Sequence, residues 1–371
     1  MRQDAVFAAV NFASRWLWTR ERKFLTNGFG TESSPYEFLK ETVAFWQCYL
    51  TADLHDGTLH DENDCVGELC DRTNQVDSDP LMTLALLRFA TNALLSASVA
   101  LGRDASLRRQ WQALLCTLAP YPTATHNGTT VFVASANSTE LEASMAIYPG
   151  SIVAGDNCTG NSYSYEYAAN TTRSSIEQMG ADFFRSYSLT KGFSAALLAR
   201  VDKSLLFPNM LLNLRPCSDA DNRDRDMNGK VCLQRNGLAD NHNGGGLETI
   251  GGMDLVHNLV LQSRDGVLRL FPWLSDDFHT ASFRRLRALG GFVVSANYSA
   301  AAGGVQRIEI TFPDEERLCE VEVPHGWGVL HICEGSKPVV AKRQKKRTSS
   351  FWGEANLTYV LQPTSCGEGE R

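Results

Sequence analysis

The spacing of apolar and polar residues predicts helices over the first two thirds of the chain. Ser34 and Glu37 stand in capping-box register, with proline at the first helical position between them. Apolar residues from Leu39 to Trp46 then follow on one helical face. We therefore expect a helix over residues 35–50.

Two more helices are expected next. The first opens at Asp79-Pro80 and ends at Gly102, and apolar residues surround it, which predicts burial on all sides. The second ends before Pro120. Helical spacing resumes over residues 176–214, and such a succession of helices suggests antiparallel pairs in a toroid or bundle.

Two regions interrupt the helical pattern. Residues 121–172 are rich in Ser, Thr, Tyr and Gly and are expected to form a long surface excursion with short strands. Residues 217–246 are expected to form a polar loop, in which Asp224 to Gly229 matches the start of an EF-hand calcium loop. Position twelve of that motif is Arg235 instead of the glutamate that binds calcium, so we favour a plain loop and predict no metal.

From Val267 onward the period changes to two. Ile308 and Ile310, for example, alternate with polar or charged residues, as in half-buried strands. The predicted fold class is therefore mainly α followed by β. We expect a helical domain over residues 1–264 and an antiparallel β-sandwich domain over residues 265–371.

Composition narrows the class of protein. The chain has 371 residues, 43% hydrophobic and 21% charged, which is typical of a globular protein with room for two cores. Its net charge of −7 argues against nucleic acid as the main partner. The basic run over residues 342–347 is expected to be a solvated hairpin. No stretch is expected to span a membrane, and no phosphate-binding, zinc-binding or nucleophile-elbow motif is found, so we predict no cofactor.

Sequons and cysteines point to a compartment. Ten cysteines and six Asn-x-Ser/Thr sequons suggest a glycoprotein of the secretory pathway or the extracellular space. The first ten residues are a poor signal peptide, because their apolar region is short and follows Asp4. We therefore expect that the chain lacks its own beginning. The sequon asparagines are Asn127, Asn137, Asn157, Asn170, Asn297 and Asn356.

Residues 243–272 carry the first candidate for chemistry. A glycine run leads to Glu248, and apolar residues at helical spacing follow until Asp265-Gly266, which is expected to end the helix. A carboxylate at the entry to a packed helix is well placed for acid or base chemistry, although the helix dipole alone also favours glutamate there. His257 falls inside this helix and is expected to be a hydrogen-bonded helix histidine, not a catalytic base.

Residues 60–71 form a second candidate, an acidic loop between two helices. Such a density of carboxylates is costly unless it is solvated, bound to ions or used to separate pKa values. One interpretation is a solvated loop pinned by a disulfide. The other is catalytic: sugar hydrolysis needs two carboxyl groups across the scissile bond, and Glu68 (or Glu62) and Glu248 could supply them.

Several stretches resemble glycoside hydrolase family 95 and its uncharacterised relatives. In those proteins, a helix ending in Leu-Leu-Gln-Ser-His/Arg-Asp-Gly leads into the strand that leaves the catalytic barrel. The specific match consists of Gly244-Gly245-Gly246-Leu247-Glu248 and Leu261-Gln262-Ser263-Arg264-Asp265-Gly266-Val267-Leu268-Arg269-Leu270-Phe271-Pro272. Further matches lie within residues 35–41, 101–104, 111–122 and 287–295.

The resemblance implies an (α/α)6 toroid, incomplete at its N-terminus, followed by a β domain. It also implies inverting hydrolysis of a terminal sugar, typically α-L-fucose, from an oligosaccharide or glycan. Glu68 fits the family's general acid best, with Glu62 as its rival, and Glu248 stands where the family usually has a water-activating aspartate. The residues expected to contact the substrate are Asn63, Asp64, Asn243, Gly245, Gly246 and His257.

A second hypothesis belongs to another class. The family activates its water through an asparagine pair in early barrel helices, and we cannot place that pair in this chain. The alternative is therefore a truncated or catalytically inactive relative that binds carbohydrate without cleaving it.

Overall fold

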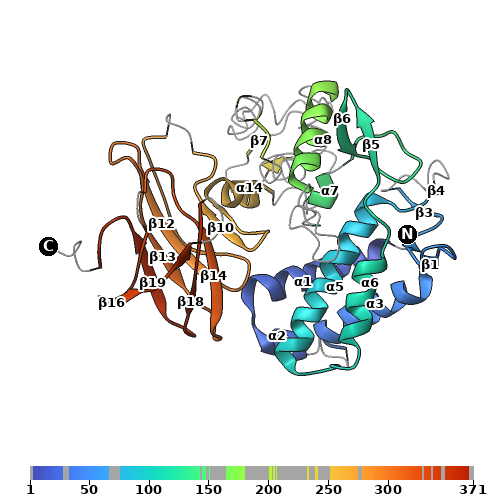
Figure 1. The fold of residues 1–371 in the computed structure, drawn as a ribbon, viewed down its shortest axis with the longest axis horizontal. Coiled ribbons are helices and arrows are strands. Elements are labelled where there is room, and N and C mark those ends of the chain that lie inside the picture. Colours follow the sequence, from blue (N-terminus) through green and yellow to red (C-terminus); the bar gives the residue numbers. More distant parts are fainter. Residues whose placement is uncertain are drawn as a thin grey trace. The chain divides into compact units, whose positions relative to one another are not determined.

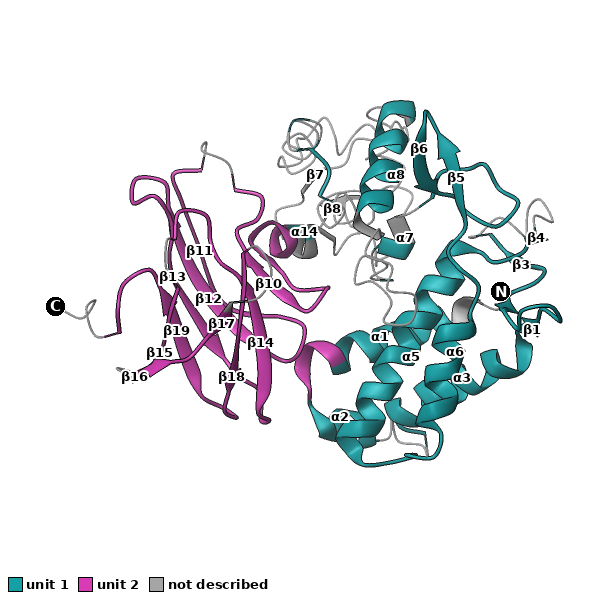
Figure 2. Cartoon of the chain, viewed as in Figure 1, with its two compact units in different colours: residues 1–16, 21–255 teal, residues 17–20, 256–371 magenta. Residues whose placement is uncertain are grey.

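The computed structural model describes two compact units (Figure 2). One is formed by residues 1–16 and 21–255, the other by residues 17–20 and 256–371. The domain boundary expected after residue 264 stays a prediction, because a division by contacts does not show which part folds alone. The described residues are 3–27, 33–66, 76–142, 144–147, 150, 164–179, 200–202, 204, 206, 232–233, 239–240, 251–274, 278–327, 330–335, 337–343 and 347–366.

Two helices of the first unit begin or end where sequence signals place them. Helix α3 begins at Pro35, and the Oγ of Ser34 accepts a hydrogen bond from the backbone N–H of Glu37 at 3.3 Å. Helix α5 ends at Gly102, whose φ of 66° lies in the left-handed region. Both predictions are confirmed. The described helices before residue 180 are α1 (Gln3–Thr19), α2 (Arg22–Thr26), α3 (Pro35–Tyr49), α5 (Leu81–Leu101), α6 (Arg108–Thr117), α7 (Ser144–Ile147) and α8 (Ser164–Met179) (Figure 1).

Helix α1 has no counterpart among the expected helices, although its spacing is helical. Val6 and Trp16 are fully buried on its inner face. Its last turn belongs to the second unit, where the carbonyl of Leu17 accepts a hydrogen bond from the N–H of Gly290 at 2.8 Å. The N-terminal segment therefore contributes residues to both units.

Helix α5 corrects one expectation about membranes. Its 21 residues and a mean hydropathy of 1.6 make it long and apolar enough to cross a membrane. However, 67% of that apolar window is buried inside the structure, as for a core helix. Leu84, Leu86 and Leu94 are fully buried, but Asn92 and Val99 are exposed, so the helix is buried on most sides and not on all.

The excursion expected over residues 121–172 is partly packed into the first unit. Strands β5 (Thr123–His126) and β6 (Thr129–Phe132) form a hairpin whose turn, Asn127-Gly128, has positive φ at both residues. The N–H of Phe132 donates to the Oγ1 of Thr171 on α8 at 2.8 Å, and both residues are buried. The short strands are confirmed, but this part of the region is not merely a surface loop.

The second unit contains two sheets. Their strand orders are β17-β18-β14-β10-β9 and β11-β12-β13-β19-β15-β16. Neighbouring strands are antiparallel except β10 and β14, which run parallel where a purely antiparallel domain was expected. The strands are β9 (Leu261–Gln262), β10 (Val267–Leu270), β11 (Thr280–Arg287), β12 (Val293–Ser299), β13 (Gly304–Thr311), β14 (Arg317–Glu322), β15 (His331–Glu334), β16 (Lys337–Val339), β17 (Lys342–Arg343), β18 (Thr348–Gly353) and β19 (Thr358–Gln362).

An aromatic cluster joins the two sheets through one core. The ring of Phe312 lies 5.6 Å from that of Phe351 in one sheet and 5.1 Å from that of Tyr359 in the other. A Cβ at Gly353 would lie 2.4 Å from the Phe312 ring, so only glycine fits there. The succession of helices followed by a mainly antiparallel β region is confirmed. The six-hairpin toroid stays a prediction, because residues 180–199 and 207–231 lie outside the described residues.

The path from helix to strand differs from the expectation. Helix α14 (Gly251–Val260) ends before β9, and β9 pairs with β10 across Asp265-Gly266. Gly266 has a φ of 82°, which suits a tight turn. Asp265-Gly266 therefore turns a hairpin instead of ending the helix.

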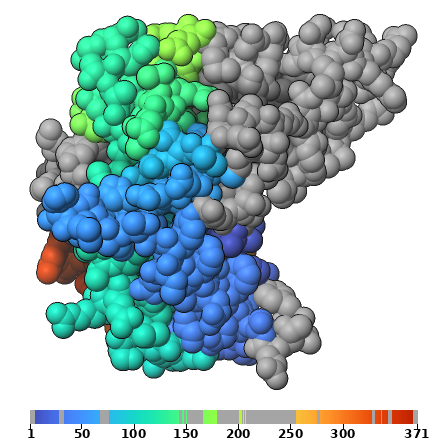
Figure 3. All heavy atoms as spheres, turned by 90° about the vertical axis from the view of Figure 1, so that its right-hand side faces the viewer, coloured from blue at the N-terminus to red at the C-terminus, as the bar shows by residue number. Residues whose placement is uncertain are grey.

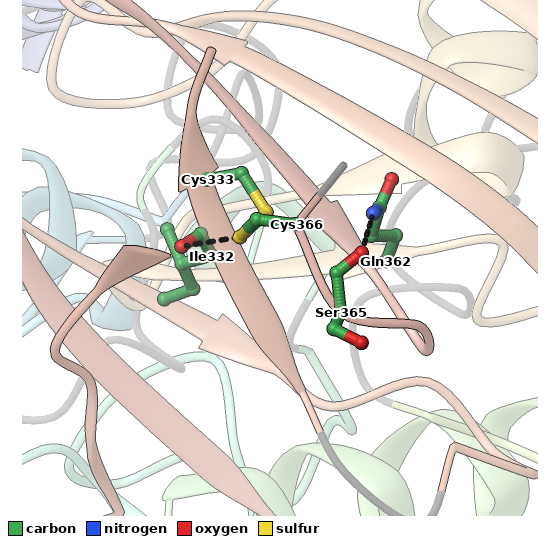
Figure 4. The surroundings of a disulfide bond; sticks show 5 residues. All are labelled: Ile332, Cys333, Gln362, Ser365 and Cys366. Carbon is green, nitrogen blue, oxygen red and sulfur yellow. Dashed lines mark hydrogen bonds between the residues drawn. A yellow bond between two sulfur atoms is a disulfide. The ribbon is translucent and has the colours of Figure 1, made fainter. Parts of the chain in front are cut away.

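A disulfide ties the end of the second unit to its sheet. Cys333 on β15 is bonded to Cys366, which follows β19, with a Cα–Cα distance of 5.7 Å (Figure 4). Gln362 donates its Nε2 to the carbonyl of Ser365 at 3.1 Å in the same turn. In the first unit, Cys65 and Cys116 each take part in a disulfide bond.

Candidate functional site

Short strands bring distant acidic residues of the first unit together. Strand β3 (Asp64–Cys65) pairs antiparallel with β4 (Val76–Asp77), which places Asp64 opposite Asp77. Close by, the carbonyl of Asp61 accepts a hydrogen bond from the N–H of Asp79 at 2.7 Å. We call His60, Asp61, Asp64, Asp77 and Asp79 the acidic corner. Figure 3 shows the neighbouring surface, where the blue to light-blue atoms belong to α3 and the segments that follow it.

His60 and Asp79 form the central pair of the acidic corner. The Nδ1 of His60 lies 2.7 Å from the Oδ2 of Asp79, and the Oδ1 of Asp79 accepts from the N–H of Asp61 at 2.9 Å. The hydrogen bond with Asp79 raises the pKa of His60, against the opposing effect of partial burial. Asp79 also has a φ of 52°, which is uncommon for a residue with a Cβ. The contact with Asp79 holds the imidazole of His60 in a fixed orientation.

Asp61 and Asp64 are buried beside this pair. The side chain of Asp64 accepts a long hydrogen bond of 3.5 Å from the Oγ1 of Thr83 on α5. Both aspartates are at most 2% exposed. Burying carboxyl groups is costly, so two of them at one place make this part of the chain a candidate functional site.

Asp77 is the member of the acidic corner that accepts hydrogen bonds from Ser135 and Asn137. Burial raises the pKa of Asp77. Hydrogen bonds from Ser135, Asn137 and the N–H of Ser78 lower the pKa by more than burial raises it, so the net shift is downward. The Nδ2 of Asn137 lies 2.6 Å from the Asp77 carboxylate. This sequon amide is therefore engaged in the fold.

The predicted site residues of this segment lie in different environments. Glu62 and Asn63 are exposed, and the backbone carbonyl of Glu62 accepts a hydrogen bond from Tyr49 at 2.9 Å. Asn63 has a φ of 55°, a conformation that asparagine tolerates well. Asp64 is buried, so its carboxyl group is not exposed to a substrate in solution.

Of the remaining predicted residues, one lies in the second unit and the others lie outside the described residues. His257 on α14 is half-buried, and its ring meets that of Trp18 edge-on at 5.4 Å. Its partial burial agrees with the predicted helix histidine, although it belongs to the second unit and not to the first. The residues outside the described ranges are Glu68, Asn243, Gly245, Gly246 and Glu248, together with the calcium-like motif over 224–229.

The segment that carries the family resemblance is a structural turn in its described part. The two Nη atoms of Arg269 donate to the two carboxylate oxygens of Asp265 at 2.6 and 2.7 Å, and its Nε donates to Glu322 at 3.0 Å. The Oγ of Ser263 accepts from the N–H of Leu289 at 2.9 Å. These polar residues hold the start of the β unit together, which explains their spacing without catalysis.

Sequence reasoning did not single out His60 or Asp79 as functional. The pair is separated by 19 positions, and Asp79 is also a natural residue before a helix. The position of Asp79 next to Pro80, and close in sequence to other carboxylates, was the signal that could have marked it as a candidate. Over the ranges that the structure describes, no group of three or more His, Cys, Asp or Glu side chains is arranged to hold a metal ion.

No protein-family model and no curated protein matches the chain. Among solved structures, it is similar to an α-L-rhamnosidase from Streptomyces avermitilis complexed with L-rhamnose, at 12% identity and a TM-score of 0.46, covering 94% of this chain and 32% of that one. It is also similar to a protein from the human microbiome described as a kojibiose phosphorylase, at 10% identity and a TM-score of 0.44, covering 95% and 50%.

A third similar structure is a family GH127 β-L-arabinofuranosidase from Geobacillus stearothermophilus T6, at 12% identity and a TM-score of 0.21, covering 75% of this chain and 41% of that one. All three are named for enzymes of sugars, and the chain spans half or less of each. None of the three is described as family 95, so that assignment stays an expectation. Because the TM-scores lie below 0.5, we base no argument on these likenesses.

Proposed function

We propose that this chain is part of a glycoside hydrolase that releases a terminal sugar, α-L-fucosidase-like, from a glycan with inversion. The observation that supports it best is the acidic corner. Because β3 pairs with β4, the two ends of segment 66–75, which contains Glu68, are held together next to buried carboxylates. A general acid needs such surroundings, since nearby negative charge favours the protonated form of a carboxyl group.

In this proposal, Glu68 protonates the leaving oxygen and Glu248 activates the attacking water. Inverting enzymes hold these two carboxyl groups about 6.5–9.5 Å apart, which leaves room for the water. Glu62, which is exposed near the same hairpin, is the alternative acid. The disulfides of Cys65, Cys116 and Cys333 support the further proposal that the protein works in an oxidising, secretory or extracellular compartment.

Two carboxylate-to-amide variants test the assignment. Glu248→Gln should abolish release of reducing sugar from a fucosylated oligosaccharide, because the water then lacks its base. Glu68→Gln should lose activity on that substrate but retain much of it on an aryl glycoside whose leaving group needs no proton. Glu354→Gln, an exposed glutamate in the turn after β18, is the matched control.

Activity that is unchanged in Glu248→Gln, with the same unfolding temperature as the wild type, would reject its role. The competing hypothesis is an inactive relative that binds carbohydrate. It predicts measurable binding of the oligosaccharide with no release of sugar by the wild type. The missing asparagine pair of the family favours this second candidate.

A further inference from the structure

The outer face of the six-stranded sheet carries an arginine-lined groove. Its volume is about 450 Å³, which is in the range of small-molecule sites. Residues alternate along these strands, so that Val294, Ile308 and Ile310 face the core. The groove is lined by Phe283, Arg284, Arg285, Val293, Ser295, Ala296, Asn297, Arg307, Glu309, Thr311 and Thr358.

A β-bulge in β11 contains two of the arginines that line the groove, Arg284 and Arg285. The register of β11 against β12 shifts between Phe283 and Leu286, so that Arg284 and Arg285 together occupy one irregular step. Arg285 has a φ of 55°, and its N–H donates to the Oγ of Ser295 at 3.0 Å. Asparagine or glycine would adopt this backbone conformation at a lower cost. The fold therefore holds Arg285 in a conformation that is unfavourable for arginine.

Positive charge is in excess in the groove. Arg307 lies opposite Asn297 on the neighbouring strand, and its Nε is 3.1 Å from Glu309, the single carboxylate of the lining. Arg284 and Arg285 are exposed, and within the described ranges neither has an ion-pair partner. A cluster of this kind stands out on a chain with a net charge of −7. Arginine forks suit carboxylate and sulfate oxygens, which they bind in pairs.

We propose that this groove binds carbohydrate through an anionic group, a uronate carboxylate or a sulfate ester. The three arginines hold the anion, and Ser295, Asn297 and Thr311 supply hydrogen bonds for sugar hydroxyls. The choice of a sugar as the carrier rests on the proposed function. The groove itself contains none of the proposed catalytic residues, so binding and hydrolysis can fail independently.

Equilibrium binding to the full chain tests the site with three oligosaccharides of equal length. We expect oligogalacturonate or a dextran sulfate fragment to bind, each identifying its own anionic group, and a neutral malto-oligosaccharide not to bind. Affinity should fall as salt rises. The double variant Arg284→Gln/Arg285→Asn should weaken binding at least about tenfold, because asparagine keeps the backbone conformation while the charge is lost.

Two single variants sharpen the test. Glu309→Gln should strengthen binding about threefold, since it removes the one repulsive charge, whereas a loss of fold would weaken it. Arg109→Gln, which removes an equally exposed positive charge on α6, should change nothing.

Several results would overturn the proposal. They are equal binding of neutral and acidic oligosaccharides, unaltered binding by the double variant, inorganic sulfate competing as well as the glycan, or tighter binding of single-stranded DNA at the same arginines. No saturable binding by any oligosaccharide would overturn it as well. A glycan found by mass spectrometry on Asn297 would also do so, because a covalent sugar would fill the groove.

Discussion

The acidic corner and the turn over residues 261–271 are both built around aspartates, but they compensate charge differently. In the turn, Asp265 receives both Nη atoms of Arg269, and Glu322 receives the Nε. In the acidic corner, the imidazole of His60 pairs with Asp79, and the buried Asp64 has no cationic partner among the described residues. The turn therefore balances its aspartate with a cation, whereas the acidic corner is the better candidate for chemistry.

The comparison also concerns the family resemblance. The specific match consists of residues 244–248, which lie outside the described residues, and residues 261–272, which form the structural turn. A motif whose residues fold a turn gives no information about catalysis by itself. The function must therefore be tested at the acidic corner, and the structural role at the turn.

The largest effect on stability is expected from the disulfide that closes the unit containing the turn. Replacing both Cys333 and Cys366 by alanine frees a loop with a sequence separation of 33, which should lower the free energy of unfolding by about 3–4 kcal/mol. Urea unfolding measures it. Sugar release below the unfolding temperature should be unchanged, and a loss of activity by the folded variant would assign the β unit a direct part in catalysis.

Removing the arginine of the turn should cost nearly as much. Arg269 and Asp265 are each only 12% exposed, so Arg269→Met leaves a carboxylate without its partner. We expect the free energy of unfolding to fall by about 2–4 kcal/mol. Arg307→Met is the matched control, because its pair with Glu309 is 45% exposed on both sides and should change stability by less than about 1 kcal/mol. Equal effects of the two variants would contradict the structural role of the turn.

The acidic corner should respond in the opposite way. Asp64→Asn removes a buried charge that Thr83 compensates poorly, so stability should change by less than about 1 kcal/mol or increase. If Glu68 is the general acid, as proposed, sugar release should fall, because less negative charge is then left to favour its protonated form. Asp314→Asn, at an exposed position, serves as the control for both measurements. A destabilisation as large as that of Arg269→Met would show that the acidic corner is a structural cluster too.

The smallest effect concerns pH. The hydrogen bond with Asp79 raises the pKa of His60, so its contribution to stability is present below the ordinary imidazole value and is lost as pH rises through the folded value. The difference in unfolding free energy between wild type and His60→Gln should shrink as pH rises.

For Asp77, whose pKa is lowered, the difference in unfolding free energy between wild type and Asp77→Asn should shrink as pH falls. Differences that do not vary with pH would exclude both pairings.

Local signals predicted the parts of the fold that depend on neighbours in sequence. The capping box at Ser34 and the glycine at position 102 gave the ends of α3 and α5, since a cap acts within one helical turn. The parallel pairing of β10 with β14 joins segments some 50 positions apart, and no local pattern encodes it. The same local view placed a helix end at Asp265, where the chain turns a hairpin.

Sites were harder to predict because they depend on contacts across the fold. The acidic loop was visible as composition, but the pairing of His60 with Asp79 required a strand and a helix start to meet. The arginine groove left a signal that was overlooked: the core residues Phe283 and Leu286 are three positions apart in a strand of period two, which marks a bulge. Glu68 and Glu248 stay predictions, since both lie outside the described residues.

The proposed function is tested most directly by the anomer that is first released. Proton NMR of a fucosylated oligosaccharide with the wild-type protein should show β-L-fucose appearing before mutarotation, because an inverting enzyme reverses the α linkage in a single displacement. The same experiment with Glu248→Gln should show no release. Release of α-L-fucose first, or no release by the wild type, would contradict the account.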